Sequence, residues 1–131
     1  MRRWGALDKW QALQSFWESF GIPAYDENSV YSGQESPTLP YITYEAATGA
    51  IGSEILQTAS IWYKSNSWAG ISQKAEEIGI GIGYGGKVVP YDGGVMWVKR
   101  GQPFAQRMSE PDDDSIRRIV INVEIEYISE N

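Results

Sequence analysis

Ile119-Val120-Ile121-Asn122-Val123-Glu124-Ile125-Glu126-Tyr127-Ile128 is the stretch that decides the fold. The odd-numbered residues of this run are all apolar, and the residues between them include one asparagine and two glutamates. A period of two is typical of a β-strand with one buried face and one mostly wet face. A long strand of this kind requires neighbouring strands, so we searched outward from it along the chain.

The rest of the chain contains further segments with the composition of strands. They are rich in β-branched and aromatic residues and are bounded by glycine, proline or asparagine. We predict strands at residues 41–46, 54–64, 87–90 and 95–100. The two-glycine connection 47–53 and the Asp-Gly connection 91–94 both favour hairpins, which pair neighbouring strands antiparallel.

Two segments have the periodicity of helices. In residues 5–20, large apolar residues are three or four apart and predict one buried stripe, made of Leu7, Trp10, Leu13, Trp17 and Phe20. A second helix is predicted over 68–79, with Ser65-Asn66-Ser67 supplying N-cap chemistry. Each of the three glycines at 79, 81 and 83 costs a helix about 1 kcal/mol relative to alanine. We therefore expect only a frayed continuation to about residue 83.

Two stretches are dominated by turn-forming residues. Residues 24–40 are expected to be irregular, with Val30-Tyr31 as a short strand inside them, and residues 101–114 are expected to form a long loop. The resulting order of elements predicts an α+β fold, with a mainly antiparallel sheet and two helices packed on one face. At 131 residues, the chain is expected to form a single domain over 1–131.

Composition excludes several kinds of chemistry. The chain has no cysteine and no histidine, so disulfides, thiol catalysis, thiolate metal sites and imidazole catalysis are absent. The net charge is −6, and neither half carries a basic arm for nucleic acid. No apolar run approaches the roughly 20 residues of a membrane span, and the first residues lack the apolar core of a signal peptide. We therefore expect a cytosolic protein with no membrane partner.

Carboxylates are the main remaining candidates for chemistry. Asp112-Asp113-Asp114 could hold a hard cation, but the run lacks the alternating acids and central glycine of a calcium loop. A solvated loop is the alternative interpretation, and we favour it. Glu124 and Glu126 share one strand face and could form an acid–base pair, although nothing marks either as buried. Residues 81–86 superficially resemble a phosphate loop but lack its lysine and its preceding strand.

Short motifs in this order resemble one known family. Leu39-Pro40-Tyr41-Ile42 follows an N-terminal helix and a loop, and the strand containing Trp62 leads into a helix start at Ser65-Asn66-Ser67. A hairpin, a loop and an alternating final strand complete the chain. In this order of elements the chain resembles the bacteriophage tail terminator family, also called tail-completion or head–tail joining proteins.

The resemblance implies a virion structural protein and no enzymatic activity. Such subunits form a hexameric ring that caps the tail tube, stops its growth and docks on the connector of the filled capsid. It implies assembly in the cytoplasm of a bacterial host, passage of DNA through the lumen without specific binding, and neither catalytic residues nor a cofactor. An acidic subunit suits a channel that must not grip DNA.

A ring requires two different patches that meet head to tail. The chain has six tryptophans, eight tyrosines and three phenylalanines, more aromatic residues than a core of this size needs. Loops 24–38 and 101–114 are candidates for contact with the tube or connector. For every aromatic candidate, core packing is the alternative. The candidate interface residues are Tyr31, Trp62, Trp68, Tyr84, Tyr91, Trp97, Phe104, Asp112, Asp113 and Asp114.

Two other functions stay open at this point. The first is a small-molecule-binding α+β domain with an aromatic pocket, which would be monomeric or dimeric and would melt later with its ligand. The second is a carboxylate-dependent hydrolase, which would need Asp112–Asp114 or the Glu124/Glu126 pair to line a pocket and bind metal. Oligomeric state separates the ring from the binding domain.

Overall fold

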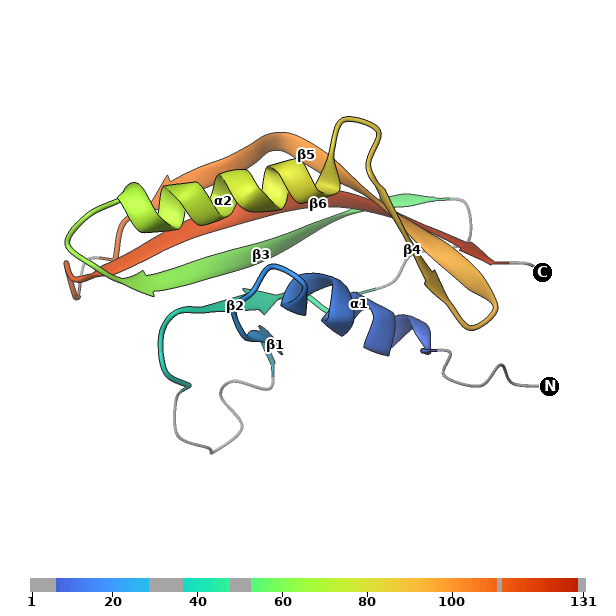
Figure 1. The fold of residues 1–131 in the computed structure, drawn as a ribbon, viewed down its shortest axis with the longest axis horizontal. Helices are drawn as coiled ribbons and strands as arrows, with labels where there is room; N and C mark the ends of the chain where they lie inside the picture. Colours follow the sequence, from blue (N-terminus) through green and yellow to red (C-terminus); the bar gives the residue numbers. More distant parts are fainter. Residues whose placement is uncertain (1–6, 29–36, 48–52, 111, 130–131) are drawn as a thin grey trace.

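The computed structural model describes residues 7–28, 37–47, 53–110 and 112–129. Within them the chain folds as two helices and six strands (Figure 1). The elements in chain order are α1 (Lys9–Glu18), β1 (Ala24–Asp26), β2 (Tyr41–Tyr44), β3 (Glu54–Lys64), α2 (Ala69–Ile82), β4 (Lys87–Tyr91), β5 (Gly94–Met108) and β6 (Ile116–Ser129).

All six strands belong to one sheet with the order β1-β2-β3-β6-β5-β4. Only β1 and β2 pair parallel, and every other neighbouring pair is antiparallel. The prediction of an α+β fold with a mainly antiparallel sheet is confirmed. The predicted hairpin partners, β2 with β3 and β4 with β5, also pair as expected.

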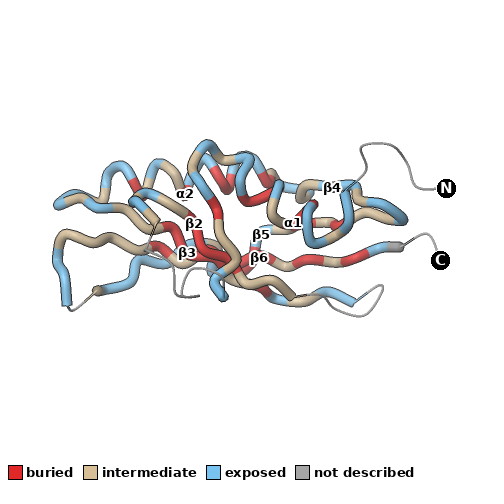
Figure 2. Tube along the Cα trace, turned by 90° about the horizontal axis from the view of Figure 1, so that it is seen from below, coloured by how far each residue is buried: buried red, intermediate tan, exposed pale blue. Residues whose placement is uncertain are grey.

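The alternating strand β6 lies between the two longest neighbours, β3 and β5, as its pattern requires. Ile119, Ile121, Val123 and Ile125 are all buried, whereas Glu124 and Glu126 between them are only half-buried. Figure 2 shows the buried segments gathered where the helices meet the middle strands. α2 contacts β3, β5 and β6, and α1 contacts β1 and β4. The core is therefore built on the odd-numbered residues of β6.

Helix α1 is shorter than predicted, and its buried face overlaps the predicted stripe only in part. It begins with a capping box. The Asp8 carboxylate accepts from the backbone N–H of Gln11, and the side-chain oxygen of Gln11 accepts from the backbone N–H of Asp8. Ala12, Leu13, Phe16 and Trp17 are buried in this helix, whereas Trp10 is 48% exposed. The predicted stripe is confirmed at Leu13 and Trp17 and wrong at Leu7 and Trp10, because the sheet contacts the side of the helix that carries Ala12, Leu13, Phe16 and Trp17.

Helix α2 continues to Ile82 without fraying, so the expected weakening after residue 79 is wrong. A Cβ on Gly79 would lie 3.1 Å from the Phe104 ring, and one on Gly81 would lie 2.9 Å from the Phe20 ring. The glycines let two aromatic rings pack directly against the helix backbone, and this packing offsets their low helix propensity. The N-cap is Trp68, not one of the predicted serines, although the Ser67 hydroxyl accepts from the Ala69 amide.

The expected loop over 101–114 is wrong for its first half, because β5 continues to Met108. The register with β6 shifts between Arg100 and Ala105, so Gly101 and Pro103 lie in a bulge. A Cβ on Gly101 would lie 2.9 Å from the backbone of Asn122. The side-chain amide of Asn122 donates to the Pro103 carbonyl at 2.8 Å. Glycine and proline here mark a bend within a strand and not its end.

Residues 24–40 are also more regular than expected, because β1 occupies Ala24–Asp26 at the edge of the sheet. Its three residues pair with Ile42, Thr43 and Tyr44 of β2. No strand was predicted at Ala24–Asp26, since a three-residue strand leaves no periodic signal. The short strand predicted at Val30-Tyr31 lies outside the described residues.

Candidate functional site

The sheet has two faces of different character, which the strand register separates. Residues that pair across neighbouring strands share a face, so Leu56, Trp62, Arg118 and Glu124 lie together on the face opposite to Ile121. We call this the outer face, and the one that contains Ile121 the inner face. The outer face is only partly buried, and at Leu56 the side chain is 65% exposed.

One half of the outer face carries a row of neighbouring aromatic side chains, packed edge to face or tilted. The ring centroids of Tyr25 and Tyr41 are 5.8 Å apart, and those of Tyr41 and Trp62 are 6.5 Å apart. The Arg118 guanidinium continues the row 4.8 Å from the Trp62 ring, a cation–π contact. The Trp62 indole donates to the Thr43 hydroxyl at 2.9 Å. The row therefore runs across β1, β2, β3 and β6 as one ordered surface.

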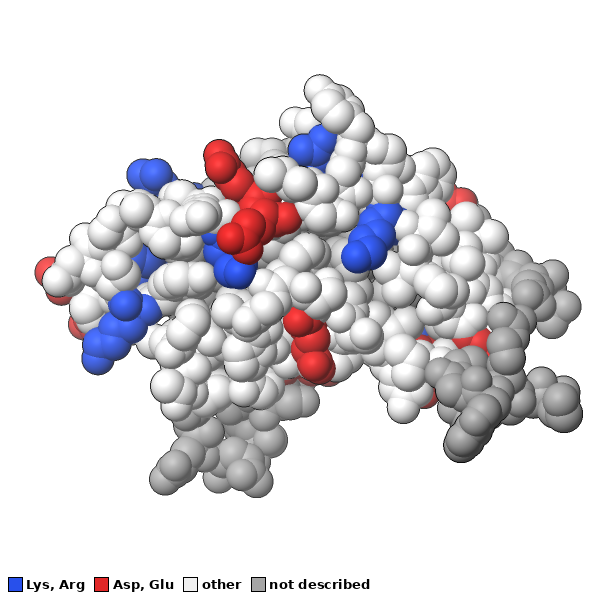
Figure 3. Space-filling view, in the orientation of Figure 1, with Lys and Arg blue, Asp and Glu red and all other residues white. Residues whose placement is uncertain are grey.

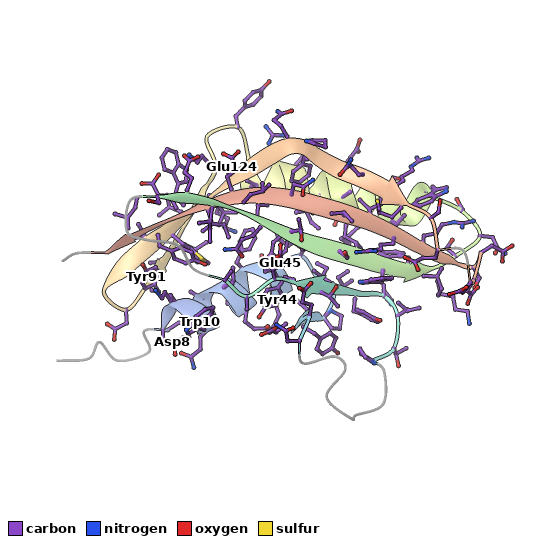
Figure 4. All side chains as sticks on the ribbon, turned by 180° about the vertical axis from the view of Figure 1, so that it is seen from behind. Asp8, Trp10, Tyr44, Glu45, Tyr91 and Glu124 are labelled. Carbon is purple, nitrogen blue, oxygen red and sulfur yellow. The ribbon has the colours of Figure 1, made fainter. Side chains whose placement is uncertain are left out.

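The other half of the outer face carries more carboxylates than ammonium groups. Lys99 forms an ion pair with Glu54, and its charge also attracts Glu124 and Glu126. The Lys99 hydrogen bond holds the pKa of Glu54 below its usual range, and the Glu54 bond raises the pKa of Lys99. Figure 4 shows Glu124 on the strands, well away from Tyr44 beside α1. Three carboxylates thus share one ammonium here.

A groove lies on the inner face between α2 and β5, with a volume of about 540 Å³. Its lining is mostly small or apolar, and polar groups come from both elements. The Arg107 guanidinium lies 5.0 Å from the Trp68 ring at one end, and the Arg100 guanidinium lies 5.2 Å from the Tyr84 ring. The lining residues are Ser72, Ala75, Glu76, Gly79, Ile80, Arg100, Phe104, Ala105, Gln106, Arg107 and Ile119.

The turn after α2 is held by the sheet. The Trp97 indole donates to the Gly85 carbonyl at 2.8 Å. Gly86 has φ +86°, and a Cβ there would lie 2.5 Å from the Trp97 indole nitrogen and 2.7 Å from the Val98 carbonyl oxygen. Only glycine fits this position. Tyr84, in the same turn, is fully exposed.

The predicted interface residues are dispersed over the molecule. Trp62 belongs to the outer-face row, Tyr84 to the turn and Phe104 to the groove. The remaining aromatic candidates in the described residues are half-buried. Trp68 packs between Arg107 and Arg117, Tyr91 packs on the core beside Tyr127, and Trp97 lies under Lys99. Tyr31 lies outside the described residues.

The acidic run between β5 and β6 is exposed, as the solvated-loop interpretation predicts. Asp113 is engaged within the turn, because its carboxylate accepts from both the hydroxyl and the amide of Ser115. These bonds hold the pKa of Asp113 below its usual range. Within the described ranges no group of three acidic side chains is placed to hold a metal ion, and this includes Asp112 and Asp114.

Sequence reasoning did not single out Arg100, Arg107 or Leu56. Arg100 and Arg107 lie on the part of the chain that was expected to be the end of a strand and a loop, and the bulge in β5 places both beside α2. Leu56 sits in a strand that was correctly predicted, but nothing in its alternation marks which face is covered. Leu56 stands out only through its pairing with Glu124 across the two strands, and this pairing is known only from the strand register.

Surface charge on one face of the molecule is scattered. Figure 3 shows acidic and basic side chains as separate groups amid uncharged surface on the face that it draws. No described helix has the length and apolarity that crossing a bilayer requires. Comparisons of the chain with protein-family models, with characterised proteins and with solved structures found no match.

Proposed function

We propose that this chain is the subunit of a ring-forming bacteriophage structural protein of the tail terminator type. Its role would be to cap the tail tube as a hexamer, stop tube growth and join the tail to the capsid connector. The virion would be its final location, after assembly in the host cytoplasm. The observation that favours this function is the outer face, a large ordered surface on one side of the sheet.

The proposal includes both helices covering the inner face. Trp17 of α1 stacks on Tyr44, with ring centroids 6.4 Å apart, and Tyr44 pairs with Ala59, which in turn pairs with the buried Ile121. α2 and Ile119 line the same groove. With both helices on one side, the outer face is left for a neighbouring subunit or a neck partner. Aromatic and arginine side chains such as Trp62 and Arg118 are enriched in such contacts.

The hydrogen-bonded carboxylates of Glu54 and Asp113 favour a structural role over a hydrolytic one for these two groups. A general acid near neutral pH needs a raised pKa. The two carboxyl groups with shifted values, Glu54 and Asp113, are shifted downward by hydrogen bonds. Both are therefore held ionised, as surface and turn-forming groups are.

The charge of the subunit suits a channel for DNA. The net charge is −6, and the arginines at 107, 117 and 118 are engaged with Trp68 and Trp62 rings. A lumen made from such subunits would repel the phosphate backbone and would let DNA slide through without specific contacts.

The test is the mass of the purified protein in solution, measured by light scattering over a wide concentration range. A ring predicts a species near six times the 14.7 kDa subunit, and negative-stain images should show a central opening. A protein that stays monomeric at every concentration, with and without purified tail tubes, would contradict the proposal.

A second candidate is the small-molecule-binding domain, which the α2–β5 groove favours. Its volume of about 540 Å³ lies within the range of ligand pockets, and Phe104 and Ile80 offer apolar contacts beside Arg100. This function predicts a monomer or dimer that binds an anionic aromatic probe such as anilinonaphthalene sulfonate in its native state. Replacement of Ala75 by Trp, which would fill the groove, should abolish that binding.

A further inference from the structure

The C-terminal end of α2 and its turn form an exposed apolar tip with a positive charge. Ile80 is 80% exposed and Tyr84 is fully exposed, which is unusual for two large apolar side chains so close in sequence. The Arg100 guanidinium lies 5.2 Å from the Tyr84 ring, and no ion pair found among the described residues includes Arg100. We call Ile80, Tyr84 and Arg100 the basic tip.

The shape of the basic tip is set by the fold and not by chance exposure of a loose turn. Gly86 is confined by the Trp97 indole and the Val98 carbonyl, and the indole also binds the Gly85 carbonyl. Tyr84 is consequently presented from a turn that β5 holds in place. Little backbone freedom of this turn would be lost when a partner binds, which favours association.

The outer face carries a patch with the opposite charge and a matching apolar residue. Leu56 is 65% exposed and pairs in register with Glu124, and Glu126 lies two residues further along the same strand. Glu54 and Lys99 neutralise each other, so Glu124 and Glu126 leave the patch with two negative charges. We call Leu56, Glu124 and Glu126 the acidic patch.

Arg100 and the acidic patch lie on opposite faces of the sheet, while the turn that carries Tyr84 reaches the outer-face residues Trp97 and Lys99 at the edge. Arg100 pairs with the buried Val123 and lines the groove beside α2, whereas Glu124, the next residue of β6, belongs to the outer face. The sheet separates the Arg100 guanidinium of one copy from Glu124 and Glu126 of the same copy. Contact between them therefore requires two molecules, and it is head to tail, because each copy contributes a different patch to each of its two neighbours.

We infer that the basic tip of one copy docks on the acidic patch of the next copy, with Arg100 facing Glu124 and Glu126 and with Ile80 and Tyr84 covering Leu56. This rests on the proposed ring-forming function and names the subunit interface of that ring. A second copy fits better than nucleic acid or an acidic peptide, both of which the acidic patch would repel. Charge complementarity and paired exposed apolar residues occur on the same chain, as self-assembly requires.

The test uses charge reversal in the full chain and reads mass by light scattering. Arg100→Glu alone and Glu124→Arg alone should each weaken the association constant by at least about tenfold, because each places like charges in contact. An equal mixture of the two variants should restore the wild-type mass, since every interface of an alternating ring then joins opposite charges. Misfolded proteins would not regain assembly on mixing.

Matched controls reverse charges that lie outside both patches. Lys64→Glu and Glu27→Arg change exposed residues by the same amounts and should keep the wild-type mass. Tyr84→Ala should weaken assembly by about thirtyfold if its ring is a central contact. If the wild type assembles and all of these variants assemble equally well, this interface is overturned and the proposed function stands. If the wild type is monomeric at every concentration, even with tail tubes, both are overturned.

Discussion

The two rows of side chains on β6, one on each face of the sheet, differ sharply in burial. Ile121, Val123 and Ile125 are completely buried, whereas Arg118, Glu124 and Glu126 alternate with them at the surface of the same strand. The inner row stabilises the fold through burial of apolar area. The outer row has little to contribute in that way, so its order must come from contacts among its own side chains.

Those contacts make the outer face a structured surface. Arg118 lies against Trp62, donates to the Ser60 hydroxyl at 3.1 Å and approaches Glu110 at 3.8 Å. Exposed ion pairs of this kind contribute little to stability, at most about 1 kcal/mol. The difference between the rows teaches that one strand can serve the core with one face and recognition with the other. The following predictions test that division.

The largest effect is expected from truncation in the inner row. Ile121→Ala removes a completely buried side chain between β3 and β5 and should lower the free energy of unfolding by about 3 kcal/mol. Leu56→Ala on the outer face should change it by less than about 0.5 kcal/mol, since the side chain is already exposed. Urea denaturation of both variants, read by tryptophan fluorescence, compares the two faces directly. Equal losses would contradict the division.

A smaller loss is expected where the turn after α2 meets the sheet. Gly86→Ala forces a Cβ into Trp97 and a positive φ on alanine, and should cost about 2 kcal/mol. Gly85→Ala is the matched control, because a Cβ there meets nothing within 4 Å. Thermal melting of the pair measures the difference. A Gly86 variant as stable as the Gly85 variant would show that the turn is not held by β5.

The hydrogen bond from Trp62 to Thr43 in the aromatic row should contribute about 1 kcal/mol to the free energy of unfolding. Trp62→Phe keeps a ring under Arg118 but removes the indole N–H that binds the Thr43 hydroxyl. A double-mutant cycle with Thr43→Val isolates this hydrogen bond from ring packing. If the losses of unfolding free energy in the two single variants add up to the loss in the double variant, the Trp62–Thr43 hydrogen bond contributes nothing to stability.

The smallest expected effect concerns Tyr44, on the inner face beside α1, whose ionisation changes the free energy of unfolding only at alkaline pH. Burial, with the nearby charges of Asp26 and Glu18, raises its pKa from 10.0 to about 12. The folded state therefore favours the neutral phenol, so this stabilisation is complete below pH 10 and is lost as the pH rises from 10 to 12. Burial also raises the pKa of Tyr127, so ultraviolet titration should show late-ionising tyrosines, and Tyr44→Phe should remove the Tyr44 part of that late signal. A normal titration of every tyrosine would contradict the burial.

Local sequence patterns were sufficient for a large part of the fold. The alternation in 119–128 and the composition of 54–64 predict β6 and β3 correctly, because the period of a half-buried strand is a property of the chain itself. The Asp-Gly connection correctly pairs β4 with β5. Composition alone also excluded cysteine and histidine chemistry. The alternation within one segment shows which of its own residues share a face, because it depends only on residues that are close in sequence.

Only the tertiary structure decided which faces are covered and where irregular residues fit. Trp10 is exposed because the strands meet α1 on another side, and Gly79 and Gly81 stay helical because Phe104 and Phe20 pack against them. Gly101 sits in a bulge because the Asn122 backbone lies beside it. The neighbours in each case are distant in sequence. The placement of Arg100 beside α2 and of Leu56 beside Glu124 depends on the same long-range register, which no local pattern encodes.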